Sequence, residues 1–399
     1  MNQGSIKRRV VLICTVFYNA YLCAENTLTP SSGDLSTRGV LTVETYEFAN
    51  LSDTNRPSIE TSPQHRRPLR DLFSQSTPDK NDSPRHRRPL RDLFSQSTPD
   101  KNERKVPIKI HAPAGTGPFP IVIVSHGAGG NWDTHYAQAQ HLASHGYMVL
   151  CLEHVGSNTD RMKQGIRLMD NINRMIRDAN EVLGRPEDVS FAIDRATEWN
   201  ESHEKLRGRF DLKRIGVIGH SFGAFTTMAV CGMRPALDWL EPSVPPGKGL
   251  GPDLHDTRVT CGIALSPQGA DEPFFIRESF ASLRTPLLAI SGTEDKQQGG
   301  LPPLNRYQSF ALWPESQGRN KFIWLANAHH LDFTDSEGAE QHGLRSATRN
   351  EVQPTTKAAT LLFFNIHLKG DAHAEQLLTT NGLKPYLRGS VNSVEVRSK

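Results

Sequence analysis

The chain has 399 residues, of which 36% are apolar and 22% charged, and its formal net charge at pH 7 is +3. This length suits one large domain with appendages, or two small domains. A net charge so close to zero gives no electrostatic ground for a nucleic-acid partner, and the modest apolar fraction indicates a folded core diluted by a polar segment.

The first 24 residues have the pattern of an export signal. Lys7, Arg8 and Arg9 precede a mostly apolar run at 10–23, and the small residue Ala24 follows. The run is short for a membrane anchor, because a spanning helix needs about 20 apolar residues. We therefore predict a cleaved signal peptide at 1–24, a flexible segment at 25–37, and a periplasmic or extracellular protein without stable membrane insertion.

A tandem repeat follows. The sequence HRRPLRDLFSQSTPDKN occupies residues 65–81 and again 86–102. Two copies are too few for a solenoid, and their polar composition predicts disorder. The flanking segments 40–48 and 106–111 alternate like strands, so the repeat would be a loop insertion, at about 53–104, in a domain spanning 38–399. It is either a duplication in a tolerant loop or a basic arm that touches anionic surfaces.

Downstream, apolar runs alternate with helical segments. The runs predict buried strands at 121–125, 148–152, 215–218, 260–265, 286–290 and 322–326. Helices are expected at 133–144, over most of 160–200, from the third run to about Met233, and at 353–368 as the closing element. Gly184 should end one helix and Pro186 begin the next. This order predicts an α/β fold with a mostly parallel central sheet and helices on both faces.

Few residues have the spacing of a metal or cofactor site. The three cysteines beyond the signal lie in apolar runs, which predicts buried thiols. The histidines of the 133–145 region lack partners at metal-ligand spacing, so we expect them to be surface residues. No dinucleotide or P-loop fingerprint occurs, and the sequence predicts neither metal nor cofactor. The three cysteines are Cys151, Cys231 and Cys261, and the three histidines are His135, His141 and His145.

The motif Gly-His-Ser-Phe-Gly at 219–223 stands between a predicted strand and a predicted helix. A serine on so sharp a turn has a strained backbone, and the residues two before and two after it crowd together. Glycine at both places removes the clash. Ser221 would be presented at the carboxyl edge of the sheet, and in this context the motif predicts a nucleophile.

A serine nucleophile needs an oxyanion hole, and a glycine-rich turn at 125–130 (SHGAGG) ends an earlier predicted strand. Its backbone N–H groups are exposed by the turn. We expect the hole to combine the N–H of Ala128 with that of Phe222.

The acid and the base should follow the serine in chain order. Asp295 ends a turn after the strand at 286–290; Glu294 and Asp271 are its rivals. The last strand runs into His329 and His330, so a base is due where two histidines stand. Chain order identifies the segment but does not choose between the neighbours.

Together, GHSFGA, SHGAGG, EHVGSN and HLDFTD resemble the α/β-hydrolases grouped with platelet-activating-factor acetylhydrolase and the bacterial predicted dienelactone hydrolases; bacterial cutinase-like polyester hydrolases are more distantly similar. The resemblance covers roughly residues 38–370 without the repeat. It implies a Ser-His-Asp esterase without metal or organic cofactor, with Ser221 as nucleophile and Ala128 and Phe222 as oxyanion donors. The family's His-x-x-Phe-Thr/Ala-Asp register selects His330 as the base.

The chain departs from the animal members of that family at the acid. Their acid stands where this chain has Ser266, whereas the bacterial members place it after the next strand, where Asp295 lies. The resemblance is thus to the bacterial branch, and a serine nucleophile argues against true dienelactone hydrolase activity, which uses cysteine. The substrate would be a small ester or a lipid-like ester.

Three alternatives stay open at this stage. A thioesterase or a peptidase could use the same fold, and a non-catalytic binding protein could use the repeat as an interaction arm. The Pro- and Gly-rich segment 234–258 is either a lid or acyl-chain wall, or an inert surface loop.

Overall fold

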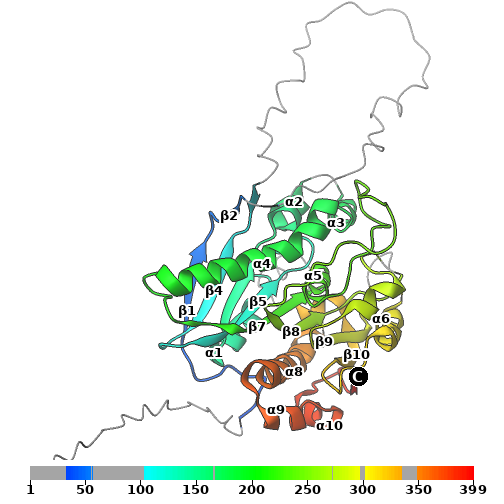
Figure 1. Cartoon of the computed structure of the whole chain (residues 1–399). Coiled ribbons are helices and arrows are strands. Elements are labelled where there is room, and N and C mark those ends of the chain that lie inside the picture. The colour runs from blue at the N-terminus through cyan, green and yellow to red at the C-terminus, as the bar shows by residue number, and fades with distance from the viewer. Residues whose placement is uncertain are drawn as a thin grey trace, which may run out of the picture. The chain divides into compact units, whose positions relative to one another are not determined.

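A nine-stranded sheet organises the computed structural model, which describes residues 33–54, 56, 103–164, 167–271, 273–296, 302–334 and 348–399. The predicted signal peptide and both repeat copies lie outside these residues. The strand order is β1-β4-β6-β5-β7-β8-β9-β10-β11 (Figure 1). The strands are β1 (Val43–Phe48), β4 (Ile108–Pro113), β5 (Phe119–Ser125), β6 (Met148–Leu152), β7 (Phe210–His220), β8 (Val259–Leu265), β9 (Leu287–Glu294), β10 (Lys321–His329) and β11 (Val394–Ser398).

The six central strands, from β6 to β10, are parallel. At the two edges the pairing is antiparallel, between β6 and β4, between β4 and β1, and between β10 and β11. After β5 the chain moves outward to β6 and then returns across β5 to β7. The order therefore reverses between β5 and β7. Ligands of such sheets bind outside the carboxyl ends of the strands at this reversal, where β5 ends at Ser125 and β7 at His220.

Helices cover both faces of the sheet, which confirms the predicted α/β class. Alternate residues of β5 face opposite ways: Ile121 and Ile123 pack with α4 (Ala179–Ser202) and α5 (Phe222–Val230) in one apolar core. Val122 and Val124 pack with α1 (Tyr136–Ser144) and α8 (Arg349–Lys369) in the other (Figure 1). Strands buried on both faces must be apolar throughout, as these runs are.

Shorter elements complete the fold. The two-residue strands β2 (Ser52–Asp53) and β3 (Arg104–Lys105) pair with each other at the base of the insertion. No helix among the described residues is long and apolar enough to cross a membrane. In the part of the chain that the structure describes, the remaining α-helices are α2 (Thr159–Lys163), α3 (Leu168–Met175), α6 (Pro303–Ser309), α9 (Ala372–Leu377) and α10 (Thr380–Leu383).

The prediction of a helix break at Gly184 and Pro186 is wrong. α4 begins after Asp178, whose side chain accepts a hydrogen bond from the Asn180 N–H, and it continues through both residues. Buried apolar side chains on both sides of the proline, such as Val182 and Val189, belong to one core. This packing outweighs the cost of the missing backbone hydrogen bond, of about 3 kcal/mol.

The predicted closing helix does not close the fold. After α8 the chain makes α9 and α10 and returns as β11, which pairs antiparallel with β10. The segment VEVRS alternates apolar and charged residues, as an edge strand with one covered face does.

Candidate active site

Ser221 occupies the strained turn between β7 and α5. Its backbone has φ 55° and ψ −115°, a conformation that L-residues rarely adopt. A Cβ at Gly219 would lie 2.1 Å from the Gly223 carbonyl oxygen, and one at Gly223 would lie 1.9 Å from that of Ser125. Only glycine fits at these two positions, as the sequence motif predicted.

The structure brings together three of the predicted site residues. The Ser221 Oγ lies 3.0 Å from the His330 Nε2, and the His330 Nδ1 lies 2.8 Å from the Asp295 Oδ1. They stand at the carboxyl ends of three parallel strands, β7, β10 and β9. The rivals for the acid lie elsewhere: Glu294 pairs with Lys296, and the carboxyl group of Asp271 is exposed.

Asp295 is fully buried and its carboxylate accepts several hydrogen bonds. The Ser266 Oγ lies 2.7 Å from Asp295 Oδ1 and 2.7 Å from His330 Nδ1, and Ser291 donates to Asp295 Oδ2 at 2.7 Å. The buried Arg306 guanidinium lies 2.6 Å from Oδ1. Burial opposes the charge, but Arg306 and the hydrogen bond from His330 outweigh it and hold the pKa of Asp295 well below its ordinary value. The group therefore remains a carboxylate at neutral pH.

Only one of the two neighbouring histidines faces Ser221. The His329 side chain is 48% exposed, and its Nδ1 lies 3.0 Å from the Thr348 Oγ1. The His330 carbonyl accepts a hydrogen bond of 2.8 Å from the His220 Nε2. Burial and neighbouring His330 hold the pKa of His220 well below its ordinary value, so His220 stays neutral and its ring keeps one N–H for this bond. The motif residue before the serine thus helps to fix the base.

The glycine-rich turn lies beside Ser221. A Cβ placed on Gly127 would be 3.5 Å from the Ser221 Cβ. Within the part of the chain that the structure describes, the backbone N–H groups of Ala128 and Phe222 donate to no backbone or side-chain acceptor. Two unpaired amides on the segments that adjoin the serine are what an oxyanion hole requires.

A second Ser-His-Asp series lies beneath this turn and was not predicted. Ser125 Oγ is 2.9 Å from His154 Nε2, and His154 Nδ1 is 2.7 Å from Asp188 Oδ2. All three side chains are fully buried. Burial and the nearby Arg185 lower the pKa of His154 to about 4, so the ring is neutral and donates through Nδ1 to Asp188. Lacking exposure, this series has no access for a substrate.

The expectation of surface histidines on α1 is wrong. His135 and His141 are 3% and 1% exposed, and His145 is partly buried. The rings of His141 and His145 pair with the carbonyl groups of Leu35 and Thr37, a segment far away in sequence. The spacing of residues along a helix cannot show that a distant segment of the chain covers their side chains. The three cysteines are buried thiols, as predicted.

The segment 234–258 packs onto the body of the molecule. The Glu241 carbonyl accepts from the Ala179 N–H at 3.1 Å, and the Ala236 N–H donates to the Phe274 carbonyl at 2.7 Å. The Phe274 ring stacks on Phe222, with centroids 5.1 Å apart. The segment therefore adjoins the residues around the serine, and its role as an acyl-chain wall stays a prediction.

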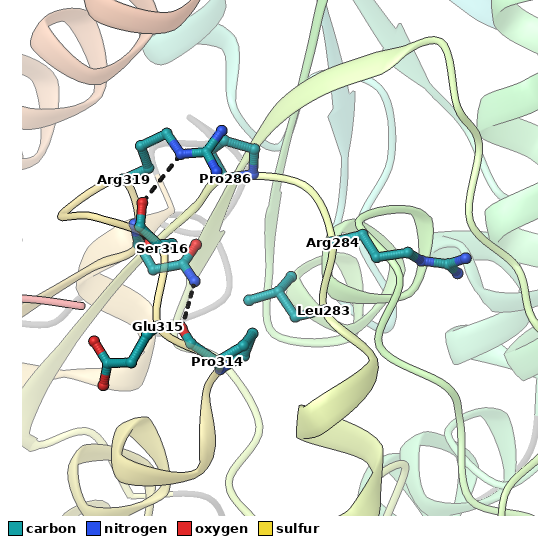
Figure 2. A pocket seen from close by; sticks show the side chains of 8 residues that line it. Leu283, Arg284, Pro286, Pro314, Glu315, Ser316 and Arg319 are labelled. Atoms are coloured by element: carbon teal, nitrogen blue, oxygen red, sulfur yellow. Dashed lines mark hydrogen bonds between the residues drawn. The ribbon is translucent and has the colours of Figure 1, made fainter.

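A hollow on another part of the surface does not belong to this site. Figure 2 shows it, with hydrogen bonds from Arg319 to the Ser316 carbonyl and from Asn320 to the Pro314 carbonyl. Its residues Pro286 and Asn320 immediately precede β9 and β10. The hollow thus lies at the amino ends of these strands, at the edge of the sheet opposite to Ser221.

Comparison with known proteins agrees with the fold. A family model described as "alpha/beta hydrolase fold" matches residues 120–237, from β5 to just beyond α5. The chain is an α/β hydrolase by fold. Platelet-activating factor acetylhydrolase from Cavia porcellus is 26% identical over 306 residues, which are 68% of this chain and 63% of that protein. The chain is thus a distant homologue of platelet-activating factor acetylhydrolase and matches less than two thirds of its length.

Proposed function

We propose that this α/β hydrolase is an exported serine esterase that cleaves carboxylic esters through an acyl-enzyme on Ser221. The observation that carries the proposal is the continuous hydrogen-bonded series from Ser221 through His330 to the buried Asp295. A nucleophile, a base and an oriented carboxylate in this order are the parts that acyl transfer needs.

In the first step, the Ser221 Oγ bonds to the ester carbonyl carbon while His330 Nε2 takes the hydroxyl proton. The carbonyl electrons move onto oxygen, and the N–H groups of Ala128 and Phe222 bind this oxyanion. Asp295 stabilises the imidazolium by accepting from Nδ1 and does not itself take the proton. Its low pKa supports this role, because a carboxylate held ionised by Arg306 has little tendency to be protonated.

In the second step, the bond from the carbonyl carbon to the leaving oxygen breaks, and His330 gives its proton to the departing alcohol. A water molecule then attacks the acyl-enzyme with His330 as base. The carboxylic acid leaves and Ser221 regains its proton. Atoms and charges balance over the cycle without a metal or a cofactor.

The substrate class we propose is a small or lipid-like carboxylic ester. The name of the distant relative, an acetylhydrolase of platelet-activating factor, supports an ester with a short acyl group.

Purified protein should be assayed against p-nitrophenyl esters of increasing acyl length, a matched thioester and a matched anilide. We expect kcat/KM to be highest for an ester, with a maximum at one end of the length series. A higher kcat/KM for the thioester or the anilide would replace the esterase proposal by a thioesterase or a peptidase. Turnover of none of the three would contradict an enzymatic function of this kind.

A further inference from the structure

One buried arginine on α4 contacts both segments that carry the oxyanion donors. Arg185 has no exposed surface, and its Nη2 donates to the carbonyl of His126, two residues before Ala128. Its guanidinium carbon lies 4.1 Å from the centre of the Phe222 ring. A guanidinium stacked on an aromatic face binds it by a cation–π interaction, which strengthens when both groups are desolvated.

The turn that Arg185 holds is also fixed from the neighbouring strand. The His126 Nε2 accepts the backbone N–H of His154 at 3.0 Å, while its Nδ1 donates to the Gly127 carbonyl at 2.7 Å. The Ser125 hydroxyl donates to His154, and the Gly129 N–H donates to the Ser157 carbonyl. Hydrogen bonds from both neighbouring segments thus hold the turn in place.

The positive charge of Arg185 is compensated by carboxylates on its own helix. Glu181 and Asp188 are buried, and both also contact Arg104, at 2.5 Å and 2.9 Å. Arg56 reaches Asp188 at 2.5 Å. Since Arg104 and Arg56 take the direct ion pairs, the Nε and Nη1 of Arg185 have no hydrogen-bond partner among the described residues.

We propose that Arg185 is a positioning residue of the oxyanion hole, which fixes the Ala128 and Phe222 donors relative to each other. The buried Ser125–His154–Asp188 series supports the turn that Arg185 holds, and it takes no part in the chemistry. The inference rests on the proposed esterase mechanism. Positioning matters here because a donor displaced by about 1 Å from the oxyanion can cost a factor of about 100 in rate.

The test replaces Arg185 by methionine and by lysine, the latter keeping a buried cation without the planar fork. We expect kcat to fall by about 10- to 100-fold with KM changed little, since the interaction acts in the transition state. The affinity for a trifluoromethyl ketone analogue should fall by a similar factor, because its adduct places an oxyanion in the hole. The affinity for the product alcohol should remain unchanged.

A matched control is Arg209→Met. Arg209 is also a buried arginine that donates to a carbonyl, that of Pro113, but it lies at the start of β7, at the other end of the strand from Ser221. This variant should lose stability while kcat stays within about twofold of the wild type, because a remote site makes no contact that changes in the transition state. Equal losses of kcat in folded Arg185 and Arg209 variants would overturn the proposal.

If both Arg185 variants fail to fold, Phe222→Leu provides the second test. It removes the ring under the guanidinium but keeps the backbone N–H, and kcat and analogue affinity should fall together. An unchanged analogue affinity would overturn the proposal. A wild-type protein that hydrolyses no ester contradicts the proposed function, whereas an active wild type with unaffected variants contradicts only the role of Arg185.

Discussion

Replacing His330 by alanine should lower kcat for ester hydrolysis by roughly 10⁶-fold, since loss of the base in a Ser-His-Asp enzyme has about that effect. The neighbouring His329→Ala should retain most of the activity. The physical reason is geometric, because His330 Nε2 lies 3.0 Å from Ser221 Oγ while His329 is turned toward Thr348. The initial rates at which the two variants hydrolyse a p-nitrophenyl ester, compared with the wild-type rate, measure both effects.

The two histidine variants control for each other. Both remove an imidazole from the same turn, so a general loosening of the turn would lower both rates alike. The reverse pattern, with activity lost in His329→Ala and kept in His330→Ala, would contradict the assignment of the base.

Replacing Asp295 by asparagine should lower kcat by about 10⁴-fold, because the amide can hold the imidazole in the wrong tautomer. The change also leaves the buried Arg306 without its counter-charge, and breaking such a pair costs about 3–5 kcal/mol of folding free energy. The rate must therefore be measured together with the free energy of unfolding. Asp295→Asn with near-normal kcat would show that another group orients His330.

Ser266→Asp in the Asp295→Asn background should recover both stability and part of the activity. The Ser266 Oγ lies 2.7 Å from His330 Nδ1, so a carboxylate there reaches the imidazole from a second direction. The backbone of Ser266 has φ 54°, a conformation that aspartate tolerates better than most residues. Failure to recover any activity in a folded double variant would show that only position 295 can supply the acid.

The parts of the site that the sequence predicted are those set by local sterics or by chain order. The crowding of Gly219 and Gly223 around Ser221 follows from the turn itself, so the motif identifies the turn without knowledge of the fold. Asp295 and the histidine pair follow from parallel strands that end at one edge. The choice of His330 needed the family register, because neighbouring residues on one turn differ only in the direction of their side chains.

The parts that the sequence did not predict depend on contacts between distant segments. Pro186 lies within a helix because packing on both sides of it outweighs its local preference. His141 is buried by Leu35, a residue more than a hundred positions away. Arg185 and Arg306 have no sequence motif around them. The sequence alone therefore does not distinguish them from other arginines in helices, because their roles depend on their neighbours in space.

The measurement that tests the account most directly is labelling with a fluorophosphonate probe, followed by peptide mapping of the modified residue. The probe reacts with an activated serine, and among the described residues the Oγ atoms of Ser221 and Ser125 each lie within hydrogen-bond distance of a histidine Nε2. We expect the label on Ser221 alone, and no labelling after Ser221→Ala, while Ser125→Ala is still labelled. A label on Ser125, or labelling and ester hydrolysis that survive in Ser221→Ala, would contradict the assignment of Ser221 as the nucleophile.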